Sequence, residues 1–103
     1  MIVLGVSHRT SPLAVREALA FPRDAMALAL HRLCTEAGLV EAMILSTCNR
    51  VELYCRAENE AQATEAVERF LCAYHHRPPE DVLPFLYRFT GPEAVRHAFR
   101  VAA

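Results

Sequence analysis

A five-residue polar stretch between two apolar segments most constrains how this chain of 103 residues folds. Residues 42–45 are an unbroken apolar run, and residues 51–56 alternate apolar and mostly polar side chains with a period of two. This pattern predicts a β-hairpin made of one buried strand and one half-buried strand. The stretch between the strands carries hydroxyl, thiol, amide and guanidinium groups, on Ser46, Thr47, Cys48, Asn49 and Arg50.

The polar stretch carries more functional groups than a tight turn requires. One residue that tolerates unusual backbone dihedral angles, such as Asn49, is enough to reverse the chain. A thiol at the end of a strand and beside a permanent cation is where a nucleophilic cysteine is expected. Cys48 is therefore a candidate nucleophile, and its alternative role as a small buried hydrophobic residue stays open on the sequence alone.

The composition indicates one small domain over residues 1–103. The chain is 53% hydrophobic with a mean hydropathy of +0.14, so part of its surface is expected to contact a partner. The net charge is -1, and the 11 basic residues, all arginine, are spread along the chain. This distribution does not predict the clustered basic surface of an independent nucleic-acid-binding protein.

The N-terminal apolar run, residues 1–6, has no basic leader and is too short for a signal peptide or a membrane span. We therefore expect a cytoplasmic protein that does not bind membranes. Four cysteines, at positions 34, 48, 55 and 72, should then stay reduced. They form no Cys-x-x-Cys pair and the histidines follow no zinc-finger spacing, so no metal is expected.

Strand and helix patterns alternate along the rest of the chain. Strands are predicted over residues 2–6 and 85–89, in addition to the two strands of the hairpin. Four helices are expected, over residues 12–20, 24–37, 59–75 and from 91 onward.

Several residues are predicted to begin or end these helices. Ser11 before Pro12 is expected to cap the first helix, and Gly38 to terminate the second. Residues 90–93, Thr-Gly-Pro-Glu, have the spacing of a capping box. The pair His75-His76 is expected to be a frayed, solvated helix end rather than a metal site.

This order of elements predicts an α+β fold of the ferredoxin-like βαββαβ type. Its four-stranded antiparallel sheet would carry helices on one face, and a C-terminal helix follows. In this arrangement Cys55 faces the core together with Val51 and Leu53. Because the ferredoxin-like fold serves many unrelated functions, the site must decide the function.

Three blocks of the chain resemble the N-terminal catalytic domain of glutamyl-tRNA reductase. They are residues 5–12 with 15–17, residues 45–54, and residues 94–102. Their order and spacing match the family across essentially the whole chain, and the central block is highly specific for it.

The resemblance implies a mechanism centred on Cys48. This thiol would attack the ester that joins glutamate to the 3′-terminal ribose of its tRNA. Hydride from NADPH would then reduce the resulting thioester to glutamate-1-semialdehyde, a precursor in tetrapyrrole (porphyrin) biosynthesis. Arg50 would either favour the thiolate or hold the substrate side-chain carboxylate. The second role explains why glutamate is selected over glutamine.

The resemblance also assigns roles to neighbouring residues. Substrate binding would involve Thr47, Cys48, Asn49 and Arg50, with Ser46 lining the site. His97 would lie near the thiol and assist proton transfer to the ribose oxygen. Its alternative is a structural histidine at the edge of a helix face, and the alternative for Asn49 is turn geometry. His8 is a weaker candidate for the same pocket.

The family has parts that have no counterpart in this sequence. They are an NADPH-binding domain of Rossmann type and a helical domain that forms the homodimer. No Gly-x-Gly-x-x-Gly sequence is present, so we expect a truncated catalytic domain that does not reduce its substrate alone. In the family the product passes to glutamate-1-semialdehyde aminomutase, which is therefore an expected partner.

Two other classes of function stay open on the sequence. A non-catalytic ferredoxin-like module that binds a ligand or RNA would not need Cys48, and Tyr54 is its only candidate for base stacking. A cysteine-based redox protein would need a second, resolving cysteine near Cys48. Cys55 is the nearest one in sequence, but it is predicted to face the core.

Overall fold

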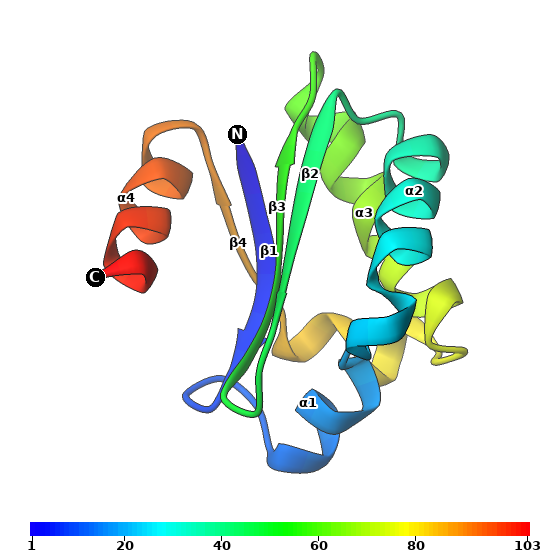
Figure 1. Cartoon of the computed structure of the whole chain (residues 1–103). Helices are drawn as coiled ribbons and strands as arrows, with labels where there is room; N and C mark the ends of the chain where they lie inside the picture. Colours follow the sequence, from blue (N-terminus) through cyan, green and yellow to red (C-terminus); the bar gives the residue numbers. More distant parts are fainter.

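The centre of the computed structural model, which describes all 103 residues, is an antiparallel sheet in the order β2-β3-β1-β4 (Figure 1). Its strands are β1 (Ile2–Ser7), β2 (Glu41–Ser46), β3 (Arg50–Arg56) and β4 (Tyr87–Thr90). The predicted α+β class with a four-stranded antiparallel sheet is confirmed. The fourth strand begins at Tyr87 rather than at residue 85, because residues 83–85, which include Pro84, form a 3-10 turn.

Helices cover both faces of the sheet. Helices α2 (Met26–Ala37) and α3 (Glu60–Tyr74) lie on one face, and α4 (Gly91–Ala102) lies on the other (Figure 1). The short helix α1 (Leu13–Leu19) lies beside the end of the sheet where β2 turns into β3. Helix α2 starts two residues later than predicted because residues 23–25 form a separate 3-10 turn.

Two of the predicted helix caps are wrong. Pro12 occupies the N-cap position of α1, and the Ser11 hydroxyl instead donates to the Ser7 carbonyl oxygen at 2.9 Å. Thr90 lies at the N-cap of α4, but its side chain makes no capping hydrogen bond. Gly38 ends α2 with a left-handed φ of 65°, as predicted.

The end of α3 also differs from the prediction. The His75 ring is half-buried, with Nδ1 3.0 Å from the Leu71 carbonyl oxygen and Nε2 3.1 Å from the Ala20 carbonyl oxygen. Burial lowers the pKa of this histidine below its usual value. His75 is therefore a structural link between α3 and α1 and not part of a frayed end, whereas His76 is exposed.

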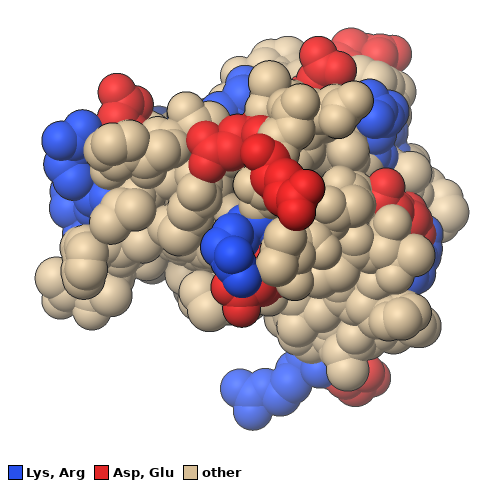
Figure 2. Space-filling view, turned by 90° about the horizontal axis from the view of Figure 1, so that it is seen from above, with Lys and Arg blue, Asp and Glu red and all other residues tan.

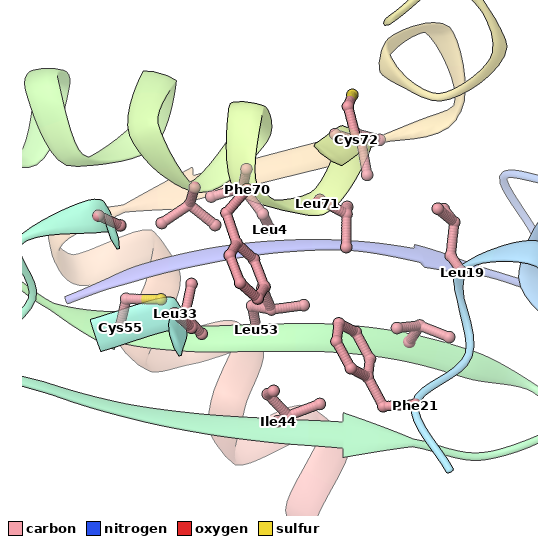
Figure 3. Packing of buried hydrophobic residues seen from close by; sticks show 14 of the residues in the cluster. Leu4, Leu19, Phe21, Leu33, Ile44, Leu53, Cys55, Phe70, Leu71 and Cys72 are labelled. Atoms are coloured by element: carbon pink, nitrogen blue, oxygen red, sulfur yellow. The ribbon is translucent and has the colours of Figure 1, made fainter. Parts of the chain in front are cut away.

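The main hydrophobic core fills the space between the sheet and helices α2 and α3 (Figure 3). The side chains of alternate residues in the two central strands point into it, namely Ile2, Leu4, Val6, Val51, Leu53 and Cys55. The predicted inward direction of Cys55 is thus confirmed. Burial raises the pKa of its thiol to about 12.

The opposite face of the sheet is only partly covered. Val3 and Tyr54 pack there against Ala94 of α4 in a small second cluster. Other apolar side chains of α4 stay exposed, including Phe99 at 72%. This face therefore carries both apolar surface and the polar groups of β3 that form the site described next.

No helix of the structure combines the length and the apolar character needed to cross a lipid bilayer. No group of three or more His, Cys, Asp or Glu side chains is placed to hold a metal ion.

Candidate active site

The turn between β2 and β3 is held by Thr47 rather than by Asn49. The Thr47 hydroxyl accepts hydrogen bonds from the backbone N–H groups of Asn49 and Arg50, each at 3.3 Å. The Thr47 N–H donates to the Arg50 carbonyl oxygen at 2.8 Å. Asn49 has no positive φ angle and its side chain makes no hydrogen bond, so the observed side-chain contacts that hold the turn come from Thr47.

Two other segments fix the backbone of this turn. Arg16 of α1 donates from Nε to the Cys48 carbonyl oxygen at 3.0 Å and from Nη1 to the Ser11 carbonyl oxygen at 2.6 Å. The His8 N–H, in the loop after β1, donates to the Asn49 carbonyl oxygen at 2.8 Å. Figure 1 shows that loop and the turn side by side at the lower end of the sheet. The backbone around Cys48 is therefore held by two segments, α1 and the loop after β1, that lie far before it in the sequence.

Cys48 is the exposed cysteine of the chain. Cys34 is half-buried, and Cys55 and Cys72 are buried, with burial also raising the pKa of the Cys72 thiol. All four thiols are free. Among them, Cys48 is the one that a large substrate in solvent can reach.

The side chain of Ser46 forms a hydrogen bond to the segment that precedes α2. Its hydroxyl accepts a hydrogen bond from the Phe21 N–H at 3.0 Å, which ties β2 to the segment before α2. The hydroxyl thus has a structural partner inside the chain. The role of Ser46 in substrate binding stays a prediction.

A buried carboxylate, Glu52, organises the polar part of the α4 face. The side chain of Glu52 is 0% exposed. It accepts hydrogen bonds from the hydroxyl groups of Tyr54 at 2.6 Å and Tyr87 at 2.5 Å, and from Nη1 of Arg50 at 3.4 Å. Nε2 of His97 is its fourth partner. Burial alone would raise the pKa of Glu52, but the hydrogen bonds from Tyr54, Tyr87 and His97 lower it below its ordinary value.

His97 therefore has a defined partner, although not Cys48. Its ring stacks on Phe89 with centroids 4.6 Å apart and lies 5.4 Å from the ring of Tyr87. The side chain is 13% exposed, and Nδ1 has no hydrogen-bond partner in the chain. No hydrogen bond joins His97 to Cys48. The structure instead links His97 to Arg50 through Glu52.

Sequence reasoning missed two residues of this arrangement, Arg16 and Glu52. Arg16 stands within a helix pattern, and Glu52 occupies one of the polar positions of the period-two alternation. A signal for Glu52 was nevertheless available. Arg50, Glu52 and Tyr54 alternate along the strand and therefore face the same side of the sheet. The sequence thus places a cation two residues before the carboxylate and a phenol two residues after it.

The stability of the fold is expected to depend on the charge of Glu52. Since its folded-state pKa lies below the ordinary value of 4.5, its contribution is fully present above pH 4.5 and is lost as the pH falls through the folded-state pKa. Urea unfolding should therefore show that the stability gap between the natural chain and Glu52→Gln narrows as the pH is lowered. The control Glu65→Gln, at an exposed carboxylate without a partner, should show no such narrowing. A gap for Glu52→Gln that is independent of pH would contradict this prediction.

The structure is thus an α+β domain with an exposed, free thiol on the turn between β2 and β3. The family model "Glutamyl-tRNAGlu reductase, N-terminal domain" matches residues 4–103. The chain belongs to this family, as the three sequence blocks predict.

Known proteins similar to the chain agree with this assignment. Glutamyl-tRNA reductase of Trichlorobacter lovleyi is 42% identical over 103 residues, which are 100% of this chain and 24% of that protein. The reductase of Neisseria meningitidis serogroup B is 44% identical over 102 residues, 99% of this chain and 23% of that protein. The solved structure of glutamyl-tRNA reductase from Methanopyrus kandleri matches with a TM-score of 0.69 and 27% identity, over 98% of this chain and 21% of that one. The chain thus spans about a quarter of the length of these relatives.

Proposed function

We propose that this chain is the part of an NADPH-dependent glutamyl-tRNA reductase that takes the glutamyl group from tRNA onto Cys48. The observation that carries the proposal is the exposed Cys48 on a turn held by α1 and by the loop after β1, in a chain of this family. The βαββαβ order and the sheet order β2-β3-β1-β4 support the ferredoxin-like description.

The proposed step is an acyl transfer. The Cys48 thiolate forms a bond to the ester carbonyl carbon, the bond from that carbon to the ribose oxygen breaks, and the ribose oxygen takes up a proton. His97 is the proposed proton donor. It would act as the imidazolium and give up its Nδ1 proton, because Nε2–H is already bonded to the Glu52 carboxylate.

Arg50 is the proposed ligand of the substrate side-chain carboxylate. Its side chain is 25% exposed, and its one hydrogen bond, from Nη1 to Glu52, leaves the other guanidinium N–H groups free. A guanidinium can bind a carboxylate with two parallel hydrogen bonds, which the uncharged amide of glutamine cannot match. Asn49, whose side chain has no partner in the chain, is a second candidate for substrate contact, and Thr47 acts mainly by shaping the turn.

Reduction of the thioester by NADPH to glutamate-1-semialdehyde belongs to the proposal for the whole reductase. The chain's three glycines lie in separate segments and form no phosphate-binding loop, so no residue here is assigned to the cofactor. They are Gly5 in β1, Gly38 after α2 and Gly91 at the start of α4. A homodimer, a cytoplasmic location and an aminomutase partner also stay proposals for the whole protein.

The alternative functions are less well supported. In an RNA-binding module Tyr54 would stack on a base, but the residue is buried, at 8% exposed, and its hydroxyl is bonded to Glu52. Figure 2 shows the end of the molecule opposite the turn, where basic side chains stand in separate places rather than in one patch. A redox pair of Cys48 and Cys55 is disfavoured because Cys55 is buried in the core.

The proposal predicts that Cys48 becomes acylated. After incubation with glutamyl-tRNA, peptide mass spectrometry should find one glutamyl group on Cys48 and none on the other cysteines. Cys48→Ala should reduce labelling roughly a thousandfold or more, as loss of a nucleophile does in other enzymes. The matched control Cys34→Ala should label normally, because Cys34 lies on α2. Unchanged labelling in Cys48→Ala, or no label in a folded natural chain, would overturn the proposal.

A further inference from the structure

Packing alone does not explain why Glu52 carries a carboxylate. It is 0% exposed in a central strand. Burying a carboxylate is unfavourable unless hydrogen bonds and cations compensate, and an apolar residue of similar size often stabilises such a site equally well. The charge of Glu52 therefore needs an explanation beyond stability.

The fold makes room for this carboxylate at a specific point. In the strand register Gly5 lies opposite both Glu52 and Tyr87. A Cβ atom on Gly5 would come within 2.8 Å of Glu52 Cγ and 2.6 Å of the Val51 carbonyl oxygen. The missing side chain at Gly5 thus provides the space that the Glu52 side chain occupies.

The four partners of Glu52 fall into two kinds. Tyr54 and Tyr87 are neutral phenols that hold the carboxylate itself, one on each oxygen. Arg50 and His97 both bond to Oε2, the oxygen that Tyr87 also contacts. The two side chains that the acyl transfer needs therefore converge on a single buried oxygen atom.

This convergence constrains both side chains. Nη1 of Arg50 donates to Glu52 at 3.4 Å, which draws the guanidinium toward the carboxylate and leaves its other N–H groups available to a second carboxylate. His97 is fixed through Nε2, so Nδ1 is the nitrogen that it offers to another group. Without Glu52, each side chain would have to be ordered when the substrate binds, which weakens binding.

We propose that Glu52 is a positioning residue that holds Arg50 and His97 in the geometry required for glutamyl transfer. It contacts neither the thiol nor the substrate and acts only through these two side chains. The part of this inference that concerns the substrate rests on the proposed function above.

The first test measures selectivity in the acylation of Cys48. The chain is incubated with glutamyl-tRNA or with glutaminyl-tRNA, and the two labelling rates are compared. Glu52→Gln should lower the preference for glutamate about ten- to a hundredfold, the effect typical of losing a residue that orients a ligand-binding group. In an Arg50→Gln background the same substitution should change the preference no further, because the two residues act as one unit.

Matched controls separate positioning from stability. Tyr54→Phe and Tyr87→Phe each remove one hydrogen bond to the same carboxylate but keep the aromatic ring, so the ring of Tyr87 stays beside His97. They should lower stability but leave the preference unchanged. If all three variants lose stability and none loses preference, Glu52 is merely structural and the inference is wrong. If Glu52→Gln does not fold, Glu52→Asp retains the charge but shortens its reach, and an unchanged preference in that variant would equally overturn the inference.

The second test does not depend on the reaction. NMR of the histidine rings should show a slowly exchanging Nε2 proton on His97, assigned by its absence in His97→Gln. This proton should persist in Tyr54→Phe and exchange rapidly in Glu52→Gln. Persistence in Glu52→Gln would overturn the inference for His97. If the natural chain shows this proton but is not acylated by glutamyl-tRNA, the proposed function fails while the positioning of His97 by Glu52 stands.

Discussion

Replacing Gly5 by alanine is expected to lower the free energy of unfolding by about 3 kcal/mol, the upper end of the usual cost of overpacking a core. The new Cβ would lie 2.6 Å from the Val51 carbonyl oxygen and 2.8 Å from Glu52 Cγ. The first of these atoms belongs to the backbone of the neighbouring strand, which cannot move without disturbing the β1–β3 pairing. Urea unfolding at neutral pH, followed by circular dichroism, measures the loss. Because the second atom belongs to Glu52, acylation of Cys48 should fall as well.

Gly38 provides the matched control for this prediction. It has a φ of 65°, and a Cβ there would meet nothing within 4 Å. Gly38→Ala should therefore cost only the strain of a left-handed backbone, about 1 kcal/mol, and should leave acylation unchanged. If Gly5→Ala were no more destabilising than Gly38→Ala, the close approach of β1 and β3 would not restrict position 5 to glycine.

The parts of the fold that were predictable from the sequence depend on local patterns. The hairpin followed from an apolar run, a polar turn and a period-two strand. The same alternation placed Cys55 correctly in the core. Gly38 ended its helix as predicted because a left-handed C-cap depends on the residue's own conformational freedom.

The errors arose where a distant or competing partner decided the outcome. The Ser11 hydroxyl could cap a helix, but the Ser7 carbonyl oxygen, four residues earlier, takes its hydrogen bond. His75 lies at a helix end that the sequence indicates should fray. Its ring is held by the Ala20 carbonyl oxygen, 55 residues away. Neither partner is visible in the local pattern.

The residues of the candidate site also fall into two groups, those that a local pattern or the family resemblance predicts and those that distant contacts decide. Cys48 and Arg50 stood out because five polar residues interrupt two strands, and His97 followed from the family resemblance. Nothing in the local pattern singled out Glu52, because a charged residue in an alternating strand usually faces water. Its burial depends on contacts with Tyr87 and His97, 35 and 45 residues further along the chain. Only the strand order and the position of α4 bring these residues together.

Replacing Arg50 by lysine is expected to reduce acylation by glutamyl-tRNA about ten- to a hundredfold while leaving acylation by glutaminyl-tRNA nearly unchanged. Lysine keeps the positive charge but cannot form two parallel hydrogen bonds to a carboxylate while also donating to Glu52. The size of the effect corresponds to one lost hydrogen bond between charged groups, roughly 1.5–3 kcal/mol. Initial rates of Cys48 labelling with the two charged tRNAs measure it.

The control variant comes from the other end of the same strand. Arg56→Lys alters an arginine that pairs with Glu41 on the surface at 2.6 Å, with both side chains more than half exposed, so it should change neither rate. The result for Arg50→Lys also separates the two roles that the sequence left open for Arg50. If neither rate falls, the positive charge that lysine retains is sufficient, and the action of Arg50 on the thiol, which attacks either ester, is supported. If only the glutamyl rate falls, Arg50 binds the side-chain carboxylate. Because Glu52 holds one edge of the guanidinium and leaves the remaining N–H groups free, the geometry favours the second result.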